Sequence, residues 1–107
     1  MPDLLVSPIS ISGVGNKVVI PGIEGQSILV VGLYFQCGVA TTITVKSGTT
    51  EITGPMTFAT GGGLQLPFTT VLAYYYCPPG EDLIFGCTGL TGSAGGQIWY
   101  FQYDETP

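Results

Sequence analysis

The residues that could carry out chemistry in this chain are few, and the most versatile of them is missing. Seven carboxylate side chains, three cysteines and two lysines are present, and there is no histidine. Without histidine the chain has neither a Ser-His-Asp nor a Cys-His arrangement for nucleophilic catalysis, and it lacks the commonest zinc ligand. We therefore expect a protein that is not an enzyme and that holds no metal or cofactor.

The carboxylates could act as a pair, as they do in glycoside hydrolysis, where two of them flank one bond. Outside the C-terminal tail the only adjacent pair is Glu81 and Asp82. Neighbours on a strand point to opposite faces, so these two would not converge on a substrate. Glu24 and Glu51 could meet in space, which the sequence does not decide. We interpret all four as solvated turn carboxylates.

The cysteines form no CxxC pair, and their odd number argues against a full disulfide framework. Cys37, Cys77 and Cys87 each lie in an apolar segment. Free cysteine is often buried as a small apolar residue, which is the interpretation that we favour. One disulfide with one free thiol is the alternative.

Aromatic side chains gather in two segments, YYY at 74–76 and WYF at 99–101. Consecutive residues of a strand alternate between its faces, so each segment places aromatic rings on both faces. One face belongs to the core, and the other is exposed or lies at an interface. Rings on such a face are core residues, a contact between subunits, or a platform for sugars. The candidates are Tyr74, Tyr75, Tyr76, Trp99 and Tyr100.

The composition excludes several classes of partner. The net charge is −5, and the only cations are Lys17 and Lys46. Two lysines cannot replace the counterions of a nucleic acid or of an anionic membrane surface. The start of the chain has no basic region before an apolar run, and no run approaches the ~20 residues of a membrane helix. We expect no nucleic-acid partner and no membrane.

Strand signals dominate the elements that must position these residues. Hydrophobic residues make up 45% and charged residues 8%, and short β-branched runs are separated by Gly and Pro. The predicted fold is a single jelly-roll-like antiparallel β-sandwich or barrel of about eight to ten short strands. Residues 1–12 are predicted to be an N-terminal arm or edge strand, because Pro8 cannot lie in mid-sheet. Residues 13–107 form the single domain.

Three segments carry more specific expectations. In residues 27–37, Ile28, Val30 and Tyr34 are expected on one face and Leu29, Val31, Leu33 and Phe35 on the other. Gly32 indicates a bulge or a close backbone approach. Residues 71–77 are predicted to be a strand. Residues 91–96, TGSAGG, are predicted to be a turn before a last strand at 97–103.

Residues 26 to 103 resemble a group of small bacteriophage virion proteins. The resemblance lies in the order of SILVVGLYFQC, TTITVKSGTTEITGPMTF, GGGLQLPF, PPGEDLIFG and GGQIWYFQY. Its most specific parts are Gly54-Pro55-Met56, Gly62-Gly63, Pro67-Phe68 and Gly80-Glu81. The aromatic YYYC segment before Pro78 departs from the pattern. Proteins of this type include capsid decoration, or cement, proteins and modules of tail and fibre proteins.

The resemblance implies a non-enzymatic virion protein, assembled in the host cytoplasm, that stabilises the head by binding its outer surface. Its partners would be other copies of itself, as a homotrimer, and the major capsid protein. The N-terminal segment would bind the capsid, and the aromatic candidates Tyr74, Tyr75, Tyr76, Trp99 and Tyr100 would form the oligomer interface. A receptor- or glycan-binding module of a tail or fibre is the alternative. The capsid-binding candidates are Leu4, Leu5, Val6, Ile9 and Ile11.

Overall fold

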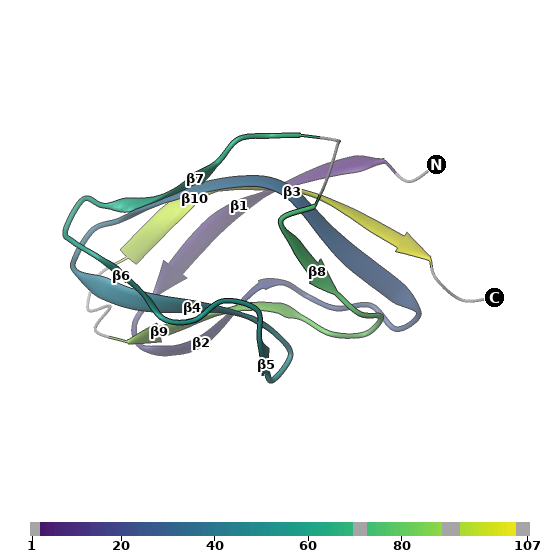
Figure 1. The fold of residues 1–107 in the computed structure, drawn as a ribbon, viewed down its shortest axis with the longest axis horizontal. Helices are drawn as coiled ribbons and strands as arrows, with labels where there is room; N and C mark the ends of the chain where they lie inside the picture. The colour runs from purple at the N-terminus through teal and green to yellow at the C-terminus, as the bar shows by residue number, and fades with distance from the viewer. Residues whose placement is uncertain (1–2, 70–72, 89–92, 105–107) are drawn as a thin grey trace.

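The computed structural model describes residues 3–69, 73–88 and 93–104, which form two antiparallel sheets and no helix. Sheet A consists of β1 (Leu4–Ser12), β3 (Gln26–Cys37), β7 (Gly63–Leu66), β8 (Tyr75–Cys77) and β10 (Ser93–Asp104). Sheet B consists of β2 (Gly15–Ile20), β4 (Thr41–Ser47), β5 (Thr50–Glu51), β6 (Met56–Phe58) and β9 (Leu83–Thr88). Figure 1 shows the sheets as two layers, which confirms the expected β-sandwich.

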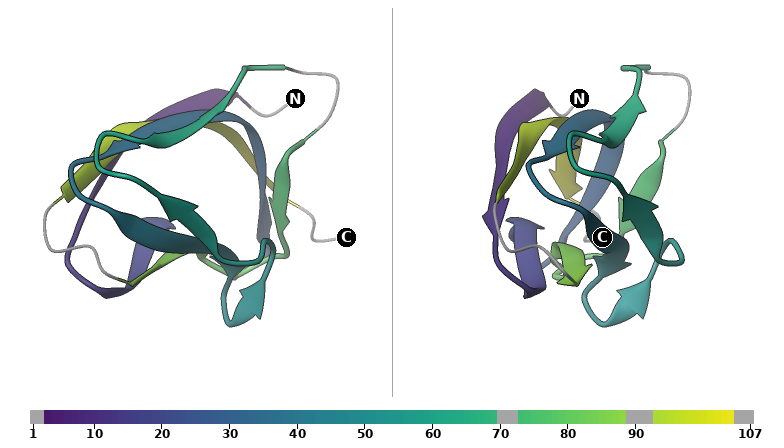
Figure 2. Two further views of the ribbon diagram at one scale, coloured as in Figure 1. Left: turned by 60° about the vertical axis from the view of Figure 1, so that its left-hand side comes forward. Right: turned by 90° about the vertical axis from the view of Figure 1, so that its left-hand side faces the viewer.

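The strands pair in a nested order, from the outermost strands of the chain inward. β1 pairs with β10, β2 with β9, β3 with β7 and β8, and β4 with β5 and β6. The central contacts of the two sheets are β10 with β3 and β9 with β4. This nesting is the arrangement of a jelly roll, and the two views of Figure 2 show its layers from other sides. The described residues also contain no helix that could cross a bilayer.

Strict alternation of burial along β4 and β9 of sheet B sends large apolar side chains into the core, with Ile84 as an apolar residue on the outer side. In β4, Ile43 and Val45 are fully buried, whereas Thr42, Thr44 and Lys46 are only partly buried. β9 alternates in the same way. This pattern follows from the two-residue period of a strand with one solvated face.

The core lies between the sheets and contains side chains from every long strand. Phe35 of β3 is at its centre, with its ring centroid 5.3 Å from that of Phe58 and 5.5 Å from that of Phe85. The first of these pairs is edge to face, a favourable arrangement of aromatic rings. The remaining buried apolar residues are Ile9, Ile11, Ile20, Ile28, Val30, Val31, Leu33, Cys37, Ile43, Val45, Cys77, Leu83, Cys87, Ala94 and Ile98.

The N-terminal segment is the edge strand of sheet A. β1 pairs with β10 from Leu4 opposite Phe101 to Ser12 opposite Ser93. Pro8 lies within it, where the missing amide donor is tolerated because one side of an edge strand has no neighbour. The side chains of Ile9 and Ile11 are buried, at 3% and 6% exposure. The segment is therefore part of the sandwich core as well as its edge.

Strand β3 contains the expected bulge, and the bulge changes which residues share a face. The pairing with β10 shifts so that Trp99 lies opposite Gly32 and Tyr100 opposite Val30, which leaves Val31 without an opposed residue on β10. Because one residue is inserted, the alternation changes phase there. Leu33 and Phe35 consequently point into the core together with Ile28 and Val30.

The expectation for the two faces of residues 27–37 was therefore wrong beyond the bulge. Leu33 and Phe35 do not share a face with Leu29, and Tyr34 does not share one with Ile28 and Val30. Gly32 itself also makes the close approach that was expected, because a Cβ there would lie 2.9 Å from the Cα of Phe68.

The turn expected at 91–96 was wrong for its described part, since residues 93–96 extend β10. Gly95 pairs with Ser10 and Gln36, and Gly96 pairs with Ile9 and Phe35. Glycine normally weakens a strand, and here it permits close packing of the strands. Residues 91 and 92 lie outside the described residues. The expected strand at 71–77 is shorter, as β8, and residues 71 and 72 also lie outside them.

Candidate functional site

The adjacent carboxylates of residues 81 and 82 hold loops together. Asp82 accepts a hydrogen bond from the backbone amide of Gly22 through Oδ1, and its carbonyl oxygen accepts one from Gly48 at 2.9 Å. Glu81 accepts a hydrogen bond from the hydroxyl of Ser47 at 3.0 Å. These bonds join three separate connections at one end of the sandwich. The two carboxylates therefore bond to other parts of the chain and are not simply the solvated turn residues that the sequence suggested.

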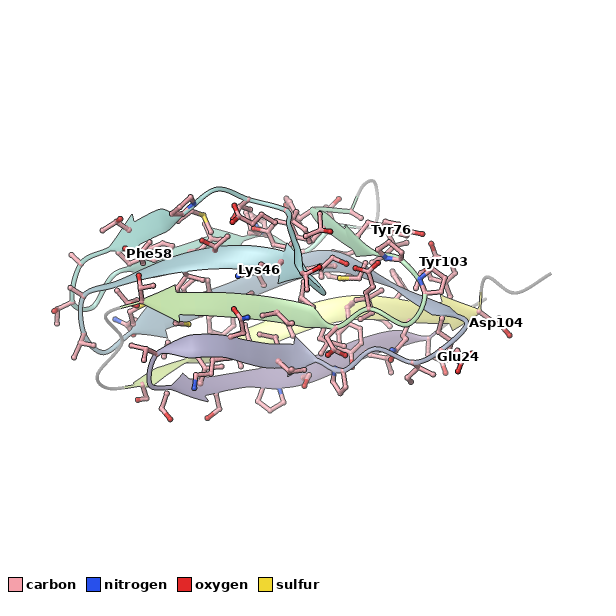
Figure 3. The ribbon with its side chains drawn as sticks, turned by 90° about the horizontal axis from the view of Figure 1, so that it is seen from below. Glu24, Lys46, Phe58, Tyr76, Tyr103 and Asp104 are labelled. Atoms are coloured by element: carbon pink, nitrogen blue, oxygen red, sulfur yellow. The ribbon has the colours of Figure 1, made fainter. Side chains whose placement is uncertain are left out.

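The other two carboxylates considered lie on different parts of the fold. Glu24 lies between β2 and β3, at the end of the sandwich where Figure 3 also shows Asp104. Glu51 is in β5, where its backbone lies opposite that of Lys46 in β4. Figure 3 shows Lys46 in the middle of the molecule. The structure therefore offers no support for a catalytic pair made of Glu24 and Glu51.

The cysteines are buried in the core as free thiols. Burial raises the pKa of Cys37. Burial also raises the pKa of Cys77. The negative charges of Glu81 and Asp82 add to this rise, and a hydrogen bond with Ser47 acts in the opposite direction. For Cys87 burial again raises the pKa, against a lowering by Lys17. Among the described residues no three Cys, Asp or Glu side chains gather as metal ligands. A protonated, buried thiol is unreactive as a nucleophile.

Because their pKa values are raised in the folded protein, these thiols should make the free energy of unfolding fall at alkaline pH. Unfolded cysteines lose their protons near their ordinary pKa of about 8.5, whereas the buried thiols, with raised pKa values, keep theirs to higher pH. Above about pH 8.5 the unfolded state binds fewer protons, so the free energy of unfolding falls by up to about 1.4 kcal/mol per pH unit for each thiol.

Urea unfolding with a reductant, followed between about pH 7 and pH 9.5, measures this fall. The variant Cys37→Ala is the control, because it removes one thiol and should lower the slope by about a third. An unfolding free energy that stays constant over this range would contradict the prediction.

The outer face of sheet A is the other candidate for a functional site. Its side chains form four cross-strand rows, two of them apolar and two of them with amide side chains. Directly opposed residues of neighbouring strands point to the same side of a sheet. The pairing of β8, β3, β10 and β1 defines two apolar rows, Tyr76–Leu29–Phe101–Leu4 and Gly32–Trp99–Val6. The pairing of β7, β3, β10 and β1 defines two amide rows, Gln65–Tyr34–Gln97–Pro8 and Gly63–Gln36–Gly95–Ser10.

The apolar rows place large hydrophobic side chains from four strands on one face, and those of β1 and β8 are the most exposed. Leu4 is 41% exposed, Val6 51% and Tyr76 44%, while Leu29 and Phe101 are half-buried. No charged residue belongs to either apolar row. The hydroxyl of Tyr76 lies 3.3 Å from that of buried Ser27, which anchors the tyrosine ring at this end. Figure 3 shows Tyr76 near Tyr103 at the same end of the molecule.

The structure divides the five aromatic candidates between the two faces of sheet A and a loop. Trp99 and Tyr76 lie in the apolar rows, where a partner can reach them. Tyr75 and Tyr100 pack against the core cluster, and burial raises the pKa of Tyr75. Tyr74 precedes β8, and its hydroxyl donates a hydrogen bond to the carbonyl of Pro67 at 2.7 Å. An interface role thus fits Trp99 and Tyr76 and does not fit Tyr75 or Tyr100.

The five capsid-binding candidates also separate. Leu4 and Val6 belong to the apolar rows, whereas Leu5 lies opposite Tyr100 and therefore on the other face of sheet A, where it is 36% exposed. Ile9 and Ile11 are part of the core, so they cannot contact another protein while the sandwich is folded. The expected capsid surface and the expected oligomer surface are therefore adjacent parts of the same patch.

A groove lies over the amide rows and was not expected from the sequence. It has a volume of about 480 Å³, and its lining includes Tyr34, Gln36, Gln65, Gly61, Gly63 and Gly95. A second groove of about 400 Å³ adjoins it and shares Gln36, Gly61 and Gly95. The bulge at Val31 placed Tyr34 on this face, so only Gly32 could have indicated its position from the sequence.

Comparisons with known proteins leave the chain without a relative from which function could be transferred. No protein-family model matches it, and no curated protein and no solved structure matches it. Its function must be inferred from its own residues.

Proposed function

We propose that this chain is a non-enzymatic virion structural protein, which decorates the outer surface of a bacteriophage head as a homotrimer. The observation that carries the proposal is the pair of apolar rows on sheet A. Contiguous exposed apolar surface on a small domain marks an interaction site. The resemblance of residues 26–103 to small phage virion proteins supports the same conclusion, and jelly rolls occur in viral capsid domains.

The partner surfaces follow from the positions of the strands. β3, β8 and β10 carry Tyr76, Leu29, Phe101 and Trp99, which we assign to contact between copies, as the enrichment of Tyr and Trp at interfaces favours. β1 is the edge strand of sheet A, so its side chains lie at the margin of the apolar rows. We assign Leu4 and Val6 to the contact with the major capsid protein, and we leave out Leu5 because it lies on the other face of β1.

The low charge of the whole surface supports association. Charged residues make up 8% of the chain, against about 25% in ordinary soluble domains. Burying a neutral surface avoids the desolvation cost of charged groups. The carboxylates Glu81 and Asp82 bond to loops, and histidine is missing, which supports a role without catalysis.

Two substitutions separate the two assigned contacts. Tyr76→Ser should weaken the trimer about tenfold, and Val6→Ser should leave the trimer intact and weaken binding to heads about tenfold. Sedimentation equilibrium measures the first effect, and cosedimentation with heads assembled without this chain measures the second. The matched control is Val18→Ser on β2 of sheet B, because Val18 is 52% exposed and Val6 51%.

The proposal would be wrong if the unchanged protein sediments as a monomer at micromolar concentration. It would also be wrong if a trimer forms and does not bind heads. Equal effects of Val6→Ser and Val18→Ser would refute the assignment of β1 to the capsid contact.

A further inference from the structure

We propose that the amide rows form a binding site for a neutral saccharide, with the ring of Tyr34 as the stacking surface. The site goes beyond decoration of a head, because it uses other rows of sheet A than the proposed protein contacts. The two sites adjoin, because the Tyr34 ring lies against Trp99 of the neighbouring apolar row.

Tyr34 has the features of a fixed stacking surface. Its side chain is 42% exposed, and its ring centroid lies 5.9 Å from that of Trp99 at an interplanar angle of 41°. Its hydroxyl donates a hydrogen bond to Oε1 of Gln97 at 3.3 Å. A ring held at both ends loses little conformational freedom on binding, which favours affinity. The C–H groups on one side of a sugar ring pack on such an aromatic face.

The groove beside this ring supplies the polar groups that a sugar requires. Gln65 lies opposite Tyr34 in one amide row, Gln36 lies in the neighbouring row, and each amide can both donate and accept hydrogen bonds. Gln36 is oriented by a hydrogen bond from its Nε2 to the carbonyl of Gly61 at 3.0 Å. Gly95 has no side chain, so a ligand can approach the backbone closely there.

The size and charge of the grooves select the class of ligand. Volumes of about 480 and 400 Å³ fall within the range of ~300–1,000 Å³ that small-molecule sites occupy. The described residues that line the two grooves include neither a carboxylate nor an amine. An anionic or cationic ligand would lose its hydration there without a compensating charge. A neutral chain of sugars needs no such charge.

The grooves adjoin through Gln36, Gly61 and Gly95, so they form one continuous depression along β3 and the first residues of β10. Such an open depression suits consecutive units of an extended saccharide better than a single enclosed sugar. Cellohexaose, maltohexaose and laminarihexaose are therefore suitable neutral probes, and hexagalacturonate is the anionic comparison.

Binding can be followed through Trp99, because it is the only tryptophan and touches the Tyr34 ring. We expect at least one neutral hexasaccharide to change its fluorescence at millimolar concentration and to show saturation transfer by NMR. Tyr34→Ala should weaken binding about tenfold, which is about 1.4 kcal/mol. Saturation transfer gives the affinity of this variant independently of Trp99.

The control is Val18→Ala on sheet B, which removes an exposed side chain outside the grooves and the proposed contacts, with 52% exposure against 42% for Tyr34. This control should bind the saccharide unchanged. The proposal is overturned if no neutral probe binds, if the anionic probe binds as tightly, or if the two variants behave alike. A trimer that decorates heads and binds no sugar would refute this site alone, and a monomer that binds sugar would refute the proposed decoration alone.

Discussion

Replacing Phe85 by alanine is expected to lower the free energy of unfolding by about 3–5 kcal/mol. The ring is fully buried, and it lies against Phe35, with 5.5 Å between the centroids. Removing it discards most of the apolar area of that side chain and leaves a cavity at the centre of the core. Domains of this size have a total stability of only about 5–15 kcal/mol, so the variant would lose a large part of it.

Chemical denaturation followed by circular dichroism measures this loss. The control is Ile84→Ala, which lies next to Phe85 in β9 but on the outer side of sheet B, where it is only half-buried. It should cost about 1 kcal/mol. If Phe85→Ala does not fold, Phe85→Leu, expected to cost about 1.5 kcal/mol, tests the same position. Equal losses at residues 84 and 85 would show that the core is not where the structure places it.

Gly96→Ala is expected to destabilise the protein by about 3 kcal/mol, the upper end of the range for overpacking. A Cβ at residue 96 would overlap the carbonyl oxygen of Tyr34 on β3. The overlapping atom belongs to the backbone of a central strand, so it cannot rotate away as a side chain could. The two strands would have to separate along the most extensive pairing of sheet A.

The adjacent residue provides the control for this effect. A Cβ at Gly95 would meet nothing closer than the carbonyl oxygen of Ile9, at 3.4 Å, which is an ordinary contact. Gly95→Ala should therefore change stability by less than about 0.5 kcal/mol, or raise it slightly, because alanine restricts the unfolded chain. Unfolding curves for the two variants decide the matter, and a similar loss at both positions would contradict the close approach.

The fold class was predictable because it depends on patterns within single strands. Ile43 and Val45 alternate with threonines, and Leu83, Phe85 and Cys87 show the same period, so burial of one face follows from the sequence. The face of Tyr34 was not predictable in this way. The bulge at Val31 reverses the phase, and its position depends on pairing with Trp99 and Tyr100, more than 60 residues further along the chain.

The candidate sites were predictable only in part for the same reason. Consecutive aromatics such as Tyr75 and Tyr76 must point to opposite faces, and the sequence does not say which face is covered. The groove depends on the register of β7, β3 and β10 together. Residues such as Gln36 and Gln65 have no individual signal, because an isolated glutamine in a strand is an ordinary surface residue.

The pairing of β1 with β10 has a consequence for how the chain acquires its structure. Leu4 finds its partner in Phe101, and Ile9 finds its partner in Gly96. The chain must close a loop of nearly its whole length, at a cost in entropy, before these contacts can stabilise it. Because of such non-local pairing, β-sandwiches are among the slower two-state folders and fold in about milliseconds to seconds. During synthesis β1 and β3 have no β10 to pair with until residues 93–104 have emerged from the ribosome. Until then their unpaired edges are open to other chains, and the nascent protein is at its most prone to aggregate.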